Sequence, residues 1–509
     1  MIKYQVRPNT YTKDVFSMIK SIKHFGEVST GVFEKLVGDF MRNPTDFASF
    51  TEGITEELHR IGQLLIQETL EEMDQMLCNS GKRKQNWVVE RHEKKHLLTV
   101  LGDVYFKKTY FTNKETGITE CLLDRILGLD RNERIAEDAE ARILEEAVQT
   151  SYRRGGEDAC FTSEKVTKQA VMRKIHALEF PRGYEQPNEK RVVDYLYIEA
   201  DEDHIALQYR DKKGDLVKTK QGRKNNNAIT KLIYVHEGIM PETPQDKHRH
   251  RLIRPHYFSR TAEGCSNEEL WDTVYHYIDS QYDLSKVKKI YLSSDGGGWI
   301  VSGMRRIGGV VHVLDRYHLE KHLTKLTTPF GELAKEIRPE LYRIICKETK
   351  STFAKKIWEL ADMLPDTANR DTFHESANYI MTNWTAAKLR LAKTKGKVGS
   401  STEGHVSHAL ASRMSTQALG WSLTGADKMA QLRAYHLNGG SMLELVRYQK
   451  QQVLPMAAGA EEVCFSSKDI LESEKNRHGM VGKYVDAMSH TMRLFSGGKN
   501  YILRQIWDL

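Results

Sequence analysis

The sequence has few cysteines and no long apolar run. Its 509 residues include 6 cysteines, far apart and without a Cys-x-x-Cys pair, which favours reduced, mostly buried thiols over a disulfide framework. It has no run of about 18 apolar residues, the length that a membrane-spanning helix needs, and its mean hydropathy is −0.56. The start, MIKYQVRPNTYTKD, lacks the apolar segment of a signal peptide. We therefore expect no membrane association and a cytoplasmic location.

The excess of positive charge is small and local. The net charge of +7 comes from 76 basic and 69 acidic residues. Residues 210–260 alone contain 13 Lys or Arg and 5 Asp or Glu, a balance of +8. Most charge runs are solvated loop faces, but this one also fits a surface that follows phosphates. The candidate phosphate contacts within it are Lys220, Arg223, Lys224, Arg249 and Arg251.

The first part of the chain changes from helical to strand periodicity. Residues 1–80 place apolar side chains three and four positions apart, which predicts a helical region. Residues 81–130 alternate with period two and contain turn signals at Leu-Gly-Asp and Thr-Asn-Lys-Glu-Thr-Gly. This pattern predicts a small antiparallel sheet.

Residues 131–185 suggest a helix-turn-helix. Helical periodicity covers 134–150, the sequence RRGGEDA predicts a turn, and 166–178 forms an amphipathic pattern. The second helix is surrounded by basic residues, which we assign as candidate DNA contacts: Lys165, Lys168, Arg173 and Lys174. An ordinary helical hairpin is the alternative, and these residues alone favour it.

A new domain is predicted to begin after residues 181–191, which contain two prolines and no apolar periodicity. The order that follows is three strands, helix, strand, helix, strand, which predicts an α/β fold with a mixed sheet packed between helices. We assign 190–316 to the first part of this core and 396–440 to its last helix. A helical stretch at 317–395 separates them, and 441–509 forms a helical C-terminal region.

Acidic residues mark the expected ends of two core strands. The strand pattern KKIYLSSDGGGWI ends in Asp295 followed by three glycines. In YIEADEDHIAL, alternation places Leu196, Ile198 and Ala200 on one face and Tyr197, Glu199, Asp201 and Asp203 on the other. A carboxylate inside a central strand is unfavourable unless it is paired or binds a metal. An Asp-Gly turn and a solvated acidic edge are the ordinary alternatives.

A third acid, Glu403, falls at the start of a helix, where capping alone would also favour it. Three acids from two strands and a helix are typical of a site for two Mg²⁺ or Mn²⁺ ions, which prefer oxygen ligands. Two such ions about 4 Å apart can hold the attacking and leaving oxygens of one phosphate. The glycines after Asp295 would then make room for a nucleic-acid backbone.

Four motifs in order carry a resemblance to a known family: YLYIEADEDHIALQ, LSSDGGGWI, LDRYHLEKHL and EGHVSHALASRMSTQALGWS. The chain resembles bacterial insertion-sequence transposases of the DDE type, more narrowly the ISLre-two group, which is distantly related to Mutator-like transposases. The resemblance covers most of the chain and implies an RNase H-like catalytic core with a helical insertion.

The resemblance assigns catalytic and metal-binding roles to Asp201, Asp295 and Glu403. Asp203 is the substitute if the register is off by two. The intervals are 94 residues (201 to 295) and 108 residues (295 to 403). The second is longer than a bare core requires, which fits the insertion at 317–395.

Other residues are candidates for auxiliary roles near the three acids. Asp315 and His318, in DRYH, match a Mutator-like pattern near the site, where His318 would contact a phosphate, orient a ligand or make a structural hydrogen bond. His405 and His408 share a helix face, but no further ligand completes a zinc site, so DNA contact or structure is preferred. Arg413 is an auxiliary candidate for contact with the scissile phosphate, and a solvent-facing arginine is the preferred interpretation.

The resemblance implies a nucleoid-associated enzyme that hydrolyses phosphodiester bonds at element ends and transfers the strand to target DNA. It implies DNA as partner and a homodimer or larger assembly on DNA. The alternatives are a nuclease or resolvase that cuts without joining, and a DNA-binding protein without activity. Trp299, next to the glycines, is expected to pack in the core.

Overall fold

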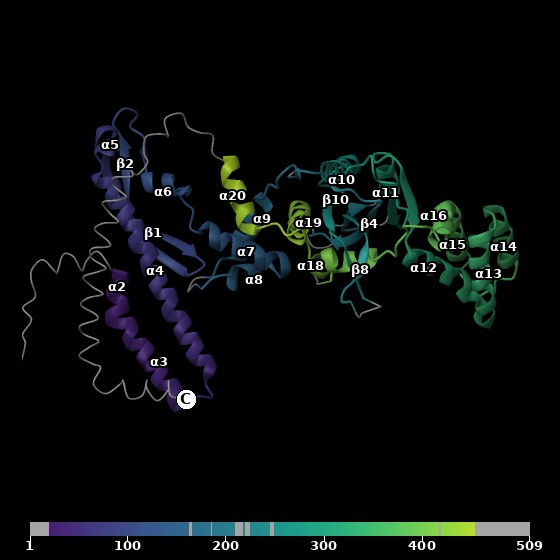
Figure 1. Ribbon diagram of the computed structural model, residues 1–509, viewed down its shortest axis with the longest axis horizontal. Coiled ribbons are helices and arrows are strands. Elements are labelled where there is room, and N and C mark those ends of the chain that lie inside the picture. Colours follow the sequence, from purple (N-terminus) through teal and green to yellow (C-terminus); the bar gives the residue numbers. More distant parts are fainter. Residues whose placement is uncertain are drawn as a thin grey trace, which may run out of the picture. The chain divides into compact units, whose positions relative to one another are not determined.

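The computed structural model describes residues 20–161, 165–184, 186–208, 217–218, 224–244, 249–416 and 419–453 (Figure 1). The chain divides into two compact units. The first contains residues 1–146, 153–168 and 446–509, and the second contains 147–152 and 169–445. The finer domain limits predicted from the sequence stay predictions.

From Lys20 on, the first unit contains helices followed by a small sheet, as the periodicity predicts. Its strands β1 and β2 pair antiparallel around a turn at Val100 and Leu101. Apolar side chains from helix α4 and both strands, such as Leu77 and Phe111, form its core. The elements are α2 (Lys20–His24), η1 (Phe25–Ser29), α3 (Thr30–Arg42), α4 (Phe47–Asn79), α5 (Gly81–Asn86), β1 (Trp87–Thr99), β2 (Gly102–Asn113), β3 (Thr119–Glu120) and α6 (Leu122–Leu127).

The predicted helix-turn-helix region contains three helices, α7 (Glu137–Gln149), α8 (Tyr152–Glu157) and α9 (Lys168–Ala177). The turn predicted at RRGGEDA is wrong, because most of that segment forms helix α8. Gly155 and Gly156 are buried in it, so their small size serves packing rather than a turn. A DNA-reading role for α9 stays a prediction.

The second unit is built on a five-stranded mixed sheet. Its strand order is β10-β7-β4-β11-β12. β4 pairs antiparallel with β7 and parallel with β11, β10 pairs antiparallel with β7, and β11 pairs parallel with β12. The mixed sheet predicted from the sequence is confirmed. Its strands and helices are β4 (Tyr195–Ala206), β7 (Asn227–His236), β10 (His256–Thr261), α10 (Asn267–Gln281), β11 (Lys289–Ser294), α11 (Gly298–Met304) and β12 (Val310–Leu314).

The two faces of this sheet carry different side chains, as the alternation in β4 predicts. Leu196, Ile198 and Ala200 pack on one face with residues of α10 and α11. Tyr197 packs on the other face with Tyr291. Two short strand pairs accompany the sheet: β5 (Val217–Lys218) with β6 (Lys224–Asn225), and β8 (Ile239–Pro241) with β9 (His250–Leu252).

The chain after β12 is helical, as predicted, and its helices α13 to α16 group together (green in Figure 1). Their apolar faces share one core with Leu314, the last residue of β12. The elements are α12 (Arg316–Thr327), η2 (Thr328–Leu333), α13 (Ala334–Lys347), α14 (Lys350–Asp362), α15 (Arg370–Thr382) and α16 (Trp384–Leu391).

A segment without regular structure then leads to the helix that carries Glu403. This helix has three parts, α17 (Thr402–Val406), a π-helical turn η3 (Ser407–Ala411) and α18 (Ser412–Met414), and is followed by α19 (Leu423–Leu437) and α20 (Met442–Val453). Residues 454–509 of the C-terminal region predicted at 441–509 lie outside the described residues. Among the helices that the structure describes, none combines the length and apolarity needed to cross a membrane.

Candidate metal centre

Three acids lie at one level across three neighbouring strands. In the parallel pairs, Ser293 lies opposite Glu199, and Ser294 lies opposite Leu314. Continuing each register along the strands places Asp295 beside both Asp201 and Asp315. Parallel strands lie about 4.8 Å apart, so these three backbone positions are neighbours, and the negative charges of Asp295 and Asp315 act on Asp201.

The glycines after Asp295 have specific structural reasons. Gly296 has φ +84°, a conformation that residues with a side chain rarely adopt. A Cβ atom at this position would also overlap the amide of Asn383. The Gly297 amide donates a 2.8 Å hydrogen bond to Asp295 Oδ1. Gly296 thus lets the chain turn tightly against Asn383, the residue between α15 and α16, a contact that the sequence did not reveal.

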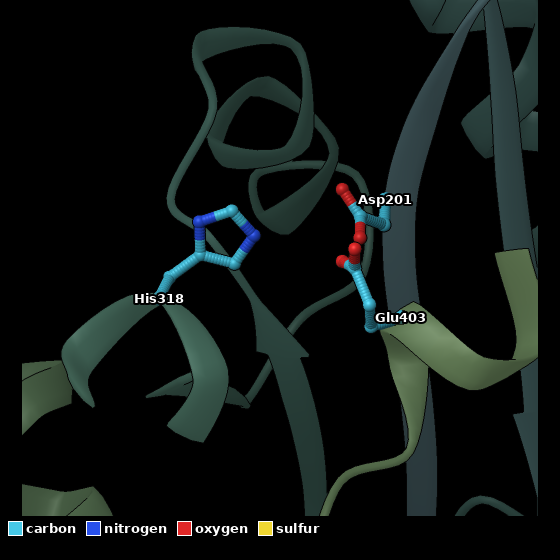
Figure 2. Close-up of side chains that lie close together, drawn as sticks. All are labelled: Asp201, His318 and Glu403. Atoms are coloured by element: carbon cyan, nitrogen blue, oxygen red, sulfur yellow. The ribbon is translucent and has the colours of Figure 1, made fainter. Parts of the chain in front are cut away.

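Glu403 and His318 complete a close group with Asp201. One ligand atom from each of these side chains lies within 4.8 Å of the others. Figure 2 shows the two carboxylates close together, with the His318 imidazole turned toward them from its own helix. Two carboxylates and an imidazole are a donor set that could hold a divalent metal ion. The Asp295 carboxylate, which accepts from Gly297, is not part of this group of described residues.

Burial and neighbouring acids make Asp201 hard to ionise. Its side chain is buried, with 8% of its surface exposed. Burial and the negative charges of Asp295, Glu403 and Asp315 raise the pKa of Asp201 to about 7, although the Glu202 amide donates to it. A divalent cation would offset both the free-energy cost of burying this negative charge and the repulsion between the acids.

Asp315 acts as a helix cap. Its Oδ2 accepts from the amides of Tyr317 and His318, at 2.8 and 3.4 Å, and so begins helix α12. Its Oδ1 accepts a 2.6 Å hydrogen bond from Ser400. Asp315 therefore fixes the start of the helix that presents His318.

Asp203, the substitute for Asp201, lies farther along β4 opposite Thr230. Its Oδ2 is buried and accepts no hydrogen bond in the described structure. It is not part of the Asp201, His318 and Glu403 group.

Three supporting residues were missed from the sequence as functional candidates. Arg390, on α16, is buried and donates to Ser293 Oγ at 2.6 Å, to the Leu314 carbonyl at 2.6 Å and to Ser400 Oγ at 3.3 Å. The Tyr379 hydroxyl, on α15, donates a 2.6 Å hydrogen bond to the Asp295 carbonyl.

Glu199 is the third of these residues. Burial alone would raise the pKa of its carboxyl, but hydrogen bonds from His236, Tyr234 and Thr402 outweigh burial and lower that pKa. Periodicity placed Glu199 on the correct face of β4. Its partners are distant in sequence, so no local pattern indicated which role it has.

The histidines after Glu403 contact aromatic rings. His405 Nδ1 lies 3.1 Å from the Tyr257 hydroxyl, and its ring centroid lies 4.6 Å from that of Tyr234. Both His405 and His408 line a hollow of about 320 Å³. Neither belongs to the metal-binding group found among the described residues, so a structural role explains His405 well.

Arg413 differs from its predicted surroundings. Only 4% of its surface is exposed, so the solvent-facing alternative is wrong. Its Nε donates to the Ala147 carbonyl at 3.1 Å, and its guanidinium lies 5.0 Å from the Trp421 ring centre. These partners account for Arg413 without a phosphate. Trp299 packs against the sheet core as predicted, and its indole donates to Glu202 at 2.8 Å.

The proposed DNA contacts are only partly described. Lys165, Lys168 and Arg173 are exposed, whereas Lys174 is half-buried. Arg249 and Arg251 are exposed at the short β8–β9 pair. Lys220 and Arg223 lie outside the described residues, and only the backbone of Lys224, in β6, is described. Their contact with DNA stays a prediction.

Most of the chain matches the model of one protein family. The model of an uncharacterised protein family, UPF0236, matches residues 41–452. The chain belongs to the UPF0236 family. This match includes every member of the candidate metal centre.

UPF0236 relatives occur in Caldanaerobacter subterraneus subsp. tengcongensis. One is 31% identical over 86% of this chain and 86% of its own length, and another is 32% identical over 82% and 85%. The name of the first relative combines eleven locus names from this one strain. The name of a further relative, which is 32% identical, combines four. This chain also has a loose similarity to one solved structure. That structure is the Drosophila P element transposase strand transfer complex, with TM-score 0.22 and 12% identity over 66% of this chain and 84% of the other. So loose a match says nothing further about this chain.

Proposed function

We propose that this UPF0236 chain is a DNA transposase of an insertion sequence, which cuts phosphodiester bonds at element ends and joins them to target DNA. One observation carries the proposal: Asp201 and Glu403 are 202 positions apart in the sequence, yet their carboxylates meet at the carboxyl edge of the sheet. A close pair of acids is unfavourable by itself, and metal-dependent phosphoryl transfer explains it.

The sheet supports the proposed RNase H-like core. Within this sheet the antiparallel strands β4, β7 and β10 come first, and then β11 pairs parallel with β4 and β12 pairs parallel with β11. Asp201 lies in β4 and Asp295 directly follows the neighbouring strand β11, an arrangement that the resemblance implies. The several locus names of one relative within one strain are also what an element that moves its own DNA would produce.

The donor set fits Mg²⁺ or Mn²⁺. Asp201 and Glu403 offer hard oxygen ligands, and His318 adds an imidazole, which suits Mn²⁺ better than Mg²⁺. We assign Asp295 as a further ligand and two ions to the working site. When bound, such ions polarise the phosphate and increase the acidity of the attacking water or 3′-hydroxyl. The chain's own acids balance the ions' charge and fix their position.

DNA is the proposed partner, bound by at least two copies of the chain, because two element ends must be joined. The exposed basic residues named above are the proposed contacts. A nucleoid-associated location follows from this role and stays part of the proposal.

The test is a cleavage and strand-transfer assay on DNA that carries candidate element ends, with Mg²⁺, with Mn²⁺ and with EDTA. Asp201→Asn and Asp295→Asn should each abolish metal-dependent joining. Asp203→Asn, on the same strand face, is the matched control and should retain most of the activity. If Asp203→Asn abolished joining and Asp201→Asn did not, the first catalytic acid would be Asp203 instead of Asp201.

The same assay separates the alternatives. Cutting without joining would favour a nuclease or resolvase, and binding without cutting would favour an inactive DNA-binding protein. Equal joining by wild type and by both variants at 201 and 295 would refute the proposed site.

A further inference from the structure

Glu199 is a buried acid whose carboxylate accepts hydrogen bonds from four identified groups. Only 2% of its surface is exposed. It lies two positions before Asp201 on the same face of β4, but it is not part of the metal-binding group of described residues. A buried carboxylate is tolerated when hydrogen bonds replace its water. Glu199 has four of them.

Two of the four donors come from the residues just before Glu403. The Ser401 amide and the Thr402 hydroxyl donate to Glu199 Oε2, at 3.0 and 2.7 Å. Thr402 is the first residue of α17 and is itself buried. Glu199 thus holds the start of the helix whose next residue is Glu403.

The other two donors fix the carboxylate itself. The Tyr234 hydroxyl donates to Oε2 at 2.7 Å, and His236 Nε2 lies 3.3 Å from Oε1. Both residues are in β7, the antiparallel neighbour of β4. The Gly238 amide donates to His236 Nδ1 at 3.2 Å, which leaves the proton of the neutral ring on Nε2, the nitrogen that faces Glu199. Strand β7 therefore fixes the orientation of the Glu199 carboxylate, and this carboxylate in turn holds the start of α17 in place.

We infer that Glu199 is a positioning residue for the metal centre, an inference that rests on the proposed function. The same strand carries Asp201 as a ligand and, two residues earlier, the acid that docks the helix of the opposing ligand, Glu403. Without this clamp, Glu403 would remain in the chain but its carboxylate would no longer be held near Asp201 and His318. Metal affinity would fall although no ligand had been removed.

The experiment measures Mn²⁺ binding by isothermal titration calorimetry with the full chain. Thr402→Val removes the hydroxyl donor and keeps the branched shape, and should weaken Mn²⁺ binding by about ten-fold, the lower end of what loss of a ligand's supporting hydrogen bond produces. Thr402→Ser keeps the hydroxyl and should bind nearly as wild type. Thr273→Val is the matched control, because its exposed hydroxyl donates only within its own helix, α10.

Glu199→Gln separates positioning from direct ligation. Its carbonyl oxygen can accept from Ser401, Thr402 and Tyr234, while its amide faces His236, so Mn²⁺ binding should stay within about three-fold of wild type. Removal of a direct ligand would weaken binding by more than about a hundred-fold, the upper end for a supporting residue.

Each outcome decides the question. Wild-type affinity in Thr402→Val, or equal weakening in Thr273→Val, overturns the inference and leaves the proposed function standing. Loss of Mn²⁺ binding in Glu199→Gln to the level of Asp201→Asn would make Glu199 a ligand, which also overturns it. If wild type neither binds Mn²⁺ nor cuts DNA, the proposed function fails, and the inference falls with it.

Discussion

Replacing Asp201 by Asn should stabilise the metal-free protein while it destroys metal binding. The structure raises the pKa of this carboxyl from 3.8 to about 7. Because the folded pKa is raised, the folded state binds the proton more tightly than the unfolded state. The stability that this proton provides is present below pH 3.8 and is lost as the pH rises toward 7.

The magnitude follows from that difference. A pKa higher by about three, at about 1.4 kcal/mol for each unit, lowers the free energy of unfolding by about 4 kcal/mol at pH 8. At pH 5 the same acid lowers it by only about 1.6 kcal/mol, because most of the folded molecules are still protonated there. Asn keeps the shape and the acceptor for the Glu202 amide, but carries no charge.

The assay is urea unfolding in EDTA at pH 5 and pH 8. Asp201→Asn should be more stable than wild type at both pH values, with the larger gain at pH 8. Added Mn²⁺ should stabilise wild type and leave the variant unchanged. Asp366→Asn, at an exposed position, is the control and should behave as wild type. An Asp201→Asn protein that unfolds at the wild-type urea concentration at pH 8 would refute this electrostatic reasoning.

Three further predictions concern the same centre. Mn²⁺ affinity should fall about ten-fold for each pH unit below 7, because protons compete for Asp201; calorimetry between pH 5.5 and 8.5 tests this, and a flat profile contradicts it. Gly296→Ala should lower the free energy of unfolding by about 1–2 kcal/mol from its left-handed backbone alone, and more because its Cβ overlaps Asn383. Gly298→Ala, where open space surrounds the added atom, should leave the free energy of unfolding nearly unchanged. Equal destabilisation by Gly296→Ala and Gly298→Ala in urea unfolding would refute that explanation. Arg390→Met leaves buried acceptors unpaired and should destabilise by about 2–4 kcal/mol, so an unchanged urea midpoint would show that Arg390 is dispensable.

The sheet and its acids could be predicted because they depend on local pattern. Alternation in β4 set the faces of Ile198 and Asp201 correctly. The strand ending at Asp295 was also evident, because apolar residues there stop at a glycine run. Parallel pairing then follows from the intervening helix, since parallel neighbours need a crossover.

The supporting residues could not be predicted, because their roles depend on contacts between distant parts of the chain. Nothing near Glu199 in the sequence indicates that Ser401 and Thr402 will donate to it. Arg390 lies in a helix whose pattern only predicts packing, and its acceptors are strand ends and a connecting segment. Arg413 was misjudged for the same reason, since a lone arginine is normally exposed.

The metal centre also depends on when its parts are synthesised. Asp201 leaves the ribosome 202 residues ahead of Glu403, and His318 lies between them. At about 5–20 residues per second, roughly 10–40 s pass before the last ligand exists. During that interval the sheet's acids have no helix to oppose them, so the nascent chain cannot assemble the group that holds the ion. A chain that stops within the helical insertion would carry Asp201, Asp295 and His318 but never the complete centre.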